Sequence, residues 1–244
     1  MGYIQFRPHT ELAPYIDAYW KVTGTVAELK TQKILPDGCV DIILNVGDSV
    51  VNADKTICMK NESAYLVGTM TKFKYSILLP QTNLIGIRFK PAGFSFFYQY
   101  ASLHELTDQT IEFEKKLAPV IGKHLDDPVP YLDRFFLNKI SGSNHGLLDV
   151  IGNIEREKGR ISVSAIAAKH CITSRRLERS FRQFIGVGPK EFTNIIRFCH
   201  ALLLLKQKSK DSNLLDIALD CGYYDHAHLS NEIKKYTGNT PSEI

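Results

Sequence analysis

The sequence predicts an α+β chain: a mainly β N-terminal domain, sandwich-like or barrel-like and followed by trailing helices, and then an all-α domain. Three observations lead to this prediction. Short runs rich in Val, Ile and aromatic residues fill the N-terminal part, apolar residues recur at helix spacing after Leu147, and two C-terminal segments are near copies of each other. A length of 244 residues is consistent with two domains.

The N-terminal strands are predicted from five short runs with turn-forming residues between them. The turn signals include Pro36-Asp37-Gly38 and Gly47-Asp48. Short strands with polar breaks between them are typical of a small antiparallel sandwich or barrel. The five runs are residues 17–24, 39–46, 65–70, 75–79 and 84–89.

After Pro91 the pattern changes to that of helices, and residues 92–100, 112–124 and 129–140 are predicted as the trailing helices. Residues 141–146 form a small polar break with two glycines, so we place the domain boundary there. The N-terminal domain is then 1–143 and the C-terminal domain 144–244. Six helices are predicted in the second domain: 147–159, 162–169, 174–185, 189–208, 213–220 and 225–236.

A repeat lies inside the C-terminal domain, where residues 173–189 align with residues 225–241 at a constant offset of 52 positions. The apolar positions fall at i, i+4 and i+7, so each copy predicts a helix with one buried stripe. The first residue of each copy is predicted to be the N-cap of that helix. With the short helix before it, each copy predicts a helix-turn-helix unit. The aligned pairs are Thr173/Asp225, Leu177/Leu229, Phe181/Ile233, Phe184/Tyr236, Gly186/Gly238 and Pro189/Pro241.

Positive charge gathers in the same domain. Residues 1–144 carry 15 basic and 15 acidic side chains, whereas residues 145–244 carry 15 basic and 11 acidic ones, so the net charge of +4 comes from the C-terminal part. The first copy presents arginines opposite its buried stripe, and an arginine-bearing helix fits the major groove of double-stranded DNA. A solvated helix pair in an interaction domain is the alternative interpretation.

Residues 216–241, DIALDCGYYDHAHLSNEIKKYTGNTP, carry an alanine, a Gly-Tyr pair, an acidic cap and a closing Gly-x-x-Pro. This segment resembles the second-motif signature of AraC/XylS-type transcription regulators, and the resemblance extends from about Leu147 to Ile244. It implies seven helices, two helix-turn-helix motifs bridged by one long helix over about 189–208, and two recognition helices that enter successive major grooves. The expected DNA-binding residues are Arg175, Arg176, Glu178, Arg179, Arg182, His226, Ala227, Ser230, Asn231 and Lys234.

The second copy departs from the family pattern. Asn231 stands where the family usually has arginine, and Leu229 and Ile233 stand where it usually has phenylalanine. The aliphatic residues keep the packing stripe, but Asn231 removes a charge, although asparagine can still bind adenine. We therefore expect the first motif to supply most of the base discrimination.

The segment 35–45, LPDGCVDIILN, resembles a stretch of an uncharacterised N-terminal domain that occurs with such DNA-binding modules. This pairing implies a regulatory domain that senses a small molecule or mediates dimerisation. The candidate ligand contacts are Trp20, Asp37, Asp41 and Arg88, with a core role for Trp20 and a turn role for Asp37 as the structural alternatives.

Two other functions were weighed. Cys39 is the candidate for a suicide alkyl acceptor, but no Arg or His lies close in sequence to lower its pKa, so we do not expect an enzyme. An interaction protein that has lost DNA binding is the third interpretation. The five cysteines show no C-x-x-C pair and the eight histidines no ligand spacing, so neither metal nor cofactor is expected.

The sequence also predicts where the chain acts and what it meets. The absence of an apolar run of roughly 18–20 residues and of a signal-like start predicts a cytoplasmic protein without a membrane partner. Beyond double-stranded DNA, the expected partners are a small-molecule effector, a second copy of the chain and RNA polymerase. Nothing in the residues decides between activation and repression.

Overall fold

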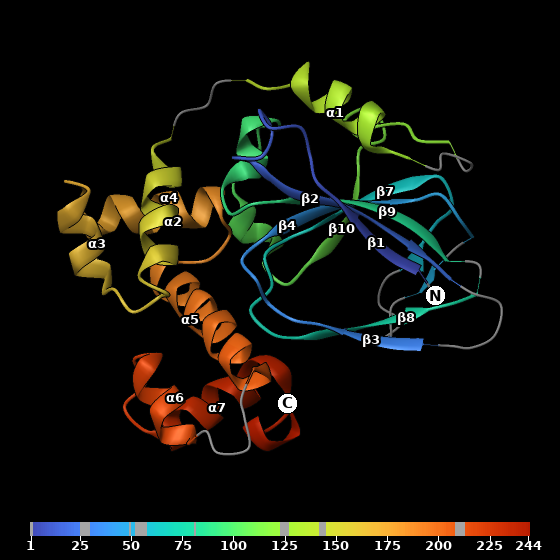
Figure 1. Cartoon of the computed structure of the whole chain (residues 1–244). Helices are drawn as coiled ribbons and strands as arrows, with labels where there is room; N and C mark the ends of the chain where they lie inside the picture. Colours follow the sequence, from blue (N-terminus) through green and yellow to red (C-terminus); the bar gives the residue numbers. More distant parts are fainter. Residues whose placement is uncertain are drawn as a thin grey trace.

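The computed structural model describes residues 2–24, 30–48, 50–51, 58–80, 82–122, 127–141, 145–207 and 213–244. In these residues a β-rich N-terminal domain is followed by a helical C-terminal domain, as Figure 1 shows. The predicted α+β class is therefore confirmed.

The N-terminal domain is built on a six-stranded antiparallel sheet with the strand order β1-β2-β9-β4-β7-β10. Alternation along β4 is typical of a sheet with two different faces, because Val40, Ile42 and Leu44 are buried on one side while Asp41 and Ile43 point to the other. The strands are β1 (Gly2–Phe6), β2 (Ile16–Thr23), β4 (Val40–Asn45), β7 (Ser63–Val67), β9 (Asn83–Phe89) and β10 (Thr110–Phe113).

One face of this sheet packs on the aromatic core of the domain. Helix α1 (Val129–Leu137) covers this face, with Phe136 packed edge-on against Phe89 at 5.6 Å between ring centroids. The Tyr19 hydroxyl donates a hydrogen bond of 3.0 Å to Asp133 Oδ1 of the same helix. The predicted helix at 129–140 is thus confirmed, and it closes the core from one side.

A two-stranded ribbon lies over the opposite face. It consists of β3 (Lys30–Ile34) and β8 (Lys74–Leu78), and Figure 1 shows it across the sheet from α1. A second short pair joins β5 (Val50–Val51) to β6 (Cys58–Met59). The space between the ribbon and the sheet is the place where the N-terminal domain is hollow, as described below.

Two of the predicted trailing helices are wrong. Residues 92–100 contain only the 3₁₀ turn η1 (Gly93–Phe96), because Phe94 and its neighbours turn inward to pack around Phe89. Residues 112–122 are not helical, since β10 pairs with β7 and turns follow it; residues 123–126 lie outside the described residues. A second 3₁₀ turn, η2 (Leu103–Leu106), precedes β10. Strands β1, β3, β5, β6 and β10 were not predicted.

The C-terminal domain contains six α-helices and one 3₁₀ turn within its described residues. They match the predicted helices closely because cap residues mark their starts: Ser162, Thr173, Asn213 and Asp225 each accept a hydrogen bond from a first-turn amide. The proposed boundary at 143/144 lies outside the described residues. The helices are α2 (Leu147–Arg156), α3 (Val163–Lys169), α4 (Ser174–Phe184), α5 (Pro189–Lys206), α6 (Leu214–Asp220), α7 (His226–Thr237) and η3 (Pro241–Glu243).

These helices form two small cores that share α5. Phe192 of α5 packs with α2, α3 and α4, whereas Phe198 packs with α6 and α7. Figure 1 shows α5 running from one group of helices to the other. In the described part of the chain, no helix is both long enough and apolar enough to cross a bilayer.

Candidate functional site

The repeated segments form two helix-turn-helix units, α3–α4 and α6–α7. In the first, Leu177 and Phe181 are fully buried and Phe184 is half-buried; in the second, the whole predicted stripe is buried. The N-caps are also as predicted, since Thr173 Oγ1 accepts from the Arg176 amide at 3.2 Å and Asp225 Oδ1 from the His228 amide at 2.7 Å. Each unit therefore holds its second helix firmly, with one face toward solvent.

The outer face of α4 carries the predicted arginines. Arg175, Arg176 and Arg179 are exposed. Arg182 is also exposed, but its Nε lies 2.8 Å from Glu178 Oε1, so these two side chains form an i,i+4 ion pair. The first three arginines thus present their charge outward, while Arg182 and Glu178 are directed toward each other.

The outer face of α7 is less charged. His226, Ala227, Asn231 and Lys234 are exposed, whereas Ser230 is half-buried and donates its hydroxyl hydrogen to the His226 carbonyl at 2.7 Å. The difference predicted between the two copies is therefore present on the surface. Base contact by any of the ten residues stays a prediction.

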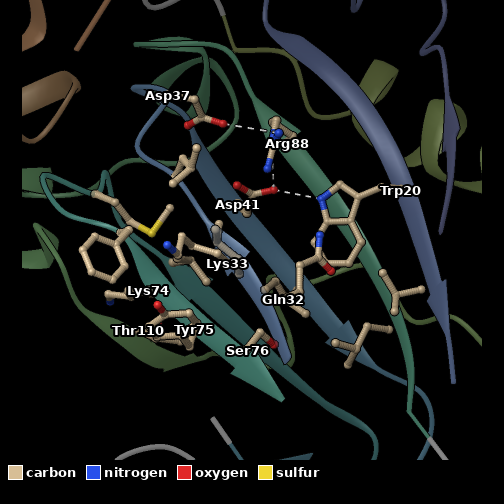
Figure 2. A pocket seen from close by; sticks show the side chains of 18 of the residues that line it. Trp20, Gln32, Lys33, Asp37, Asp41, Lys74, Tyr75, Ser76, Arg88 and Thr110 are labelled. Atoms are coloured by element: carbon tan, nitrogen blue, oxygen red, sulfur yellow. Dashed lines mark hydrogen bonds and ion pairs between the residues drawn. The ribbon is translucent and has the colours of Figure 1, made fainter. Parts of the chain in front are cut away.

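A cavity of about 840 Å³ lies between the main sheet and the β3–β8 ribbon. All four predicted ligand contacts line it, because β2, β4 and β9 are neighbours in the sheet and point these side chains to the same face. Figure 2 shows Asp41 between Arg88 and Trp20. Sequence reasoning missed the ribbon side of the cavity, which includes Gln32, Lys33, Phe73, Lys74 and Tyr75.

The four polar residues form one connected cluster at an end of the cavity. Trp20 Nε1 donates to Asp41 Oδ1 at 2.9 Å, and Arg88 Nε lies 3.4 Å from the same oxygen. Arg88 Nη1 lies 3.3 Å from Asp37 Oδ2. Burial raises the pKa of Asp41, and the nearby Arg88 guanidinium offsets this only in part. The structural alternatives also apply, since Trp20 is nearly buried and Asp37 Oδ1 accepts the Cys39 amide in a turn.

Cys39 has the chemistry of a structural thiol. Burial, and then the neighbouring Asp37 carboxylate, raise the pKa of its thiol well above the ordinary value. A thiolate nucleophile needs the opposite environment. Within the described residues, no group of His, Cys, Asp or Glu is arranged to hold a metal ion.

Comparison with known proteins separates the two domains. Residues 166–244 match the sequence profile of a helix-turn-helix domain family, and residues 4–112 match a domain family of unknown function, DUF6597. The HTH-type transcriptional regulator ArgR of Pseudomonas aeruginosa is 29% identical over 110 residues, which are 43% of this chain and 32% of ArgR. The C-terminal domain is of the AraC/XylS type.

Two further relatives complete the comparison. The HTH-type transcriptional activator RhaS of Escherichia fergusonii is 32% identical over 84 residues, 34% of this chain and 30% of RhaS. The crystal structure of ToxT from Vibrio cholerae covers 92% of this chain and 96% of its own, at 14% identity and a TM-score of 0.48. The matched part of the chain thus spans about a third of the length of the curated relatives.

The N-terminal domain contacts the first unit of the AraC-type domain through η2. His104 Nδ1 faces the Gly186 carbonyl at 2.8 Å and Nε2 faces Arg182 Nη1 at 2.8 Å, so the ring donates from one nitrogen and accepts at the other. The Thr107 hydroxyl donates to the same carbonyl at 2.7 Å, and the Thr69 hydroxyl donates to the Ile185 carbonyl. Arg182 is therefore held on its domain-facing side.

The N-terminal domain also contacts the second unit, through the walls of the cavity. Lys33 Nζ donates to the carbonyl of Thr237 at 2.7 Å and to Asn239 Oδ1 at 2.6 Å. The Phe73 ring lies directly against Gly238, the αL residue that ends α7. No local pattern in the sequence marks these contacts, because each joins residues that are far apart in the chain.

Proposed function

We propose that this protein is a sequence-specific DNA-binding transcription regulator of the bacterial cytoplasm, controlled through its N-terminal domain by a small molecule or by dimerisation. The observation that carries the proposal is the pair of capped helix-turn-helix units, of which α4 turns Arg175 and Arg179 to solvent. Two curated relatives of the AraC-type domain are named as transcription regulators, which supports this function. A second copy of the chain and RNA polymerase are the proposed protein partners.

The bridge between the units supports binding to one face of the duplex. Helix α5 has 18 residues and is therefore about 27 Å long at 1.5 Å per residue. This length is comparable to one turn of B-DNA, roughly 34 Å, which separates successive major grooves. We therefore infer that α4 and α7 enter adjacent major grooves.

Genomic selection followed by footprinting tests the proposal. Fragments retained by the purified full chain are expected to show two protected patches about one helical turn apart. Affinity is expected to fall steeply as salt rises, because phosphate contacts release counterions from the duplex. The absence of protected sites even at low salt would overturn the proposal and favour an interaction protein.

We also propose that the cavity under the β3–β8 ribbon is the effector site and that the chain has no catalytic role. Its volume of about 840 Å³ falls in the usual range for small-molecule sites, and it combines apolar walls with a few polar groups. The raised pKa of Cys39 supports the second point, and this thiol is expected to stay unmodified when the folded chain meets an alkylating agent or methylated DNA.

A further inference from the structure

The polar end of the cavity contains a flat aromatic surface. The indole of Trp20 lies on Gly86, where an added Cβ would come within 1.9 Å of Trp20 Cε2, so only glycine leaves room for the ring. The hydrogen bond from Trp20 Nε1 to Asp41 fixes the ring edge. Because Trp20 also lines the cavity, the ring side away from Gly86 is the one available to a ligand.

The same end carries more negative than positive charge. Asp37 and Asp41 stand against the single guanidinium of Arg88. From the described residues, hydrogen bonds reach Asp41 at Oδ1 and leave Oδ2 as an available acceptor. A carboxylate beside an indole face is the arrangement that recognises organic cations, by ion pairing and by cation–π attraction.

The remaining walls favour an apolar body on that cation. Val22, Ile43 and Leu84 continue from Trp20 along the sheet, and Phe73 and Tyr75 face them from the ribbon side. An apolar ligand body would be buried between these two layers, and the hydrophobic effect would add to its affinity.

The lysines of the cavity are already engaged. Lys33 donates to the end of α7, and Lys74 Nζ donates to the Asp108 carbonyl at 2.6 Å. Lys72 is exposed. An anionic ligand would have to draw these ammonium groups from their partners, whereas a cation meets Asp41 without breaking a contact.

We infer that the cavity takes an organic cation with an apolar body, whose protonated amine lies beside Asp41 and against the indole of Trp20. This inference rests on the proposed role of the cavity as the effector site and names the chemical class of the effector. Burial raises the pKa of Asp41, and a bound ammonium would reverse this effect.

The test uses the full chain without DNA, so its outcome is independent of DNA binding. Trp20 is the single tryptophan of the chain, and intrinsic fluorescence therefore reports only on this site. Three probes of similar size are titrated: phenethylamine as the cation, 2-phenylethanol as the neutral compound and 3-phenylpropionate as the anion. Phenethylamine is expected to bind about tenfold more tightly than either of the others.

Variants of opposite sign keep the test independent of folding damage. Asp41→Asn is expected to abolish the preference for the cation, whereas Arg88→Gln, which removes the competing positive charge, is expected to strengthen cation binding. Asp216→Asn, an exposed acidic position on α6, is the matched control and should change nothing. Equal binding of the three probes, tighter binding of 3-phenylpropionate, no binding at all, or weaker cation binding in Arg88→Gln would each overturn the inference.

Discussion

Lys33 of the β3–β8 ribbon donates a hydrogen bond of 2.7 Å to the backbone carbonyl of Thr237, the last residue of α7. The same ammonium reaches Asn239 Oδ1 and lies 5.1 Å from the centre of the Phe73 ring. Lys33 and Phe73 also line the cavity. The wall of the proposed effector site and the end of the second recognition helix therefore share side chains, which provides a direct route from one to the other.

The first prediction concerns this contact. Lys33→Met removes the ammonium but keeps an unbranched side chain, and α7 is expected to lose a support for its terminal carbonyls. Because such a hydrogen bond contributes about 1 kcal/mol, amide hydrogen exchange at the end of α7 should become about fivefold faster. Lys72→Met, at an exposed lysine of the same cavity, should leave exchange in α7 unchanged. Equal exchange in both variants would show that the contact does not stabilise the helix.

A second prediction compares two glycines. Gly238 has a φ of 74° and lies against Phe73, whose Cζ would be 2.7 Å from an added Cβ. Gly238→Ala is therefore expected to lower the free energy of unfolding by about 1–2 kcal/mol. Gly152 lies within α2 with nothing within 4 Å of an added Cβ, so Gly152→Ala should raise it by about 0.5–1 kcal/mol. Urea unfolding of both variants measures the two effects, and a destabilised Gly152→Ala would contradict the comparison.

The third prediction follows from the raised pKa of Asp41. A carboxyl whose pKa is higher in the folded than in the unfolded chain stabilises the fold below the unfolded pKa, and this contribution is lost as pH rises through the folded pKa. At neutral pH the ionised Asp41 thus costs stability. Asp41→Asn is expected to unfold at pH 7 with a free energy no lower than that of the wild type.

The pH dependence provides the control for this prediction. The difference in unfolding free energy between Asp41→Asn and the wild type should grow from pH 4.5 to pH 7, as the wild-type carboxyl ionises. A variant that is less stable at pH 7, or a difference that shrinks with rising pH, would contradict it. A stability cost at a cavity-lining carboxylate fits a residue that serves a ligand.

The repeat was predictable because its signals are local. Caps and i, i+4, i+7 spacing describe single helices, and Thr173, Asp225 and the buried stripes are found where they predict. The cluster of Trp20, Asp41 and Arg88 was predictable only as separate candidates. Their meeting depends on the order β2-β9-β4, which brings strands from distant parts of the chain together.

The errors arose where long-range contacts outweigh local preference. Residues 112–113 belong to β10 because the free edge of β7 accepts them, although Phe113 and Leu117 fit a helical pattern. The KTQKI sequence of β3 has little apolar character and becomes a strand by pairing with β8. The contacts of His104 and Lys33 with the AraC-type domain join positions 82 and 204 residues apart, and no sequence pattern reports them.

The fourth prediction concerns the unequal recognition helices. Arg179 is exposed on α4, on the side opposite the buried stripe, where a guanidinium can pair with guanine O6 and N7. Asn231 is exposed on α7 without neighbouring arginines, and its amide makes a weaker, uncharged contact. Arg179→Ala is therefore expected to cost about 1–3 kcal/mol of discrimination between the operator and a mutated site, and Asn231→Ala clearly less.

The measurement is the ratio of affinities for the footprinted operator and for a duplex with the same composition in scrambled order, at fixed salt. Lys116→Ala, an exposed lysine of the N-terminal domain, is the matched control and should leave the ratio unchanged. Arg182→Ala adds a separate expectation: since Arg182 is shared between Glu178 and His104, its loss should also loosen the contact of η2 with α4. Equal losses of selectivity in Arg179→Ala and Asn231→Ala would mean that both helices read the operator to the same extent, because the charge on α4 would then add nothing to base discrimination.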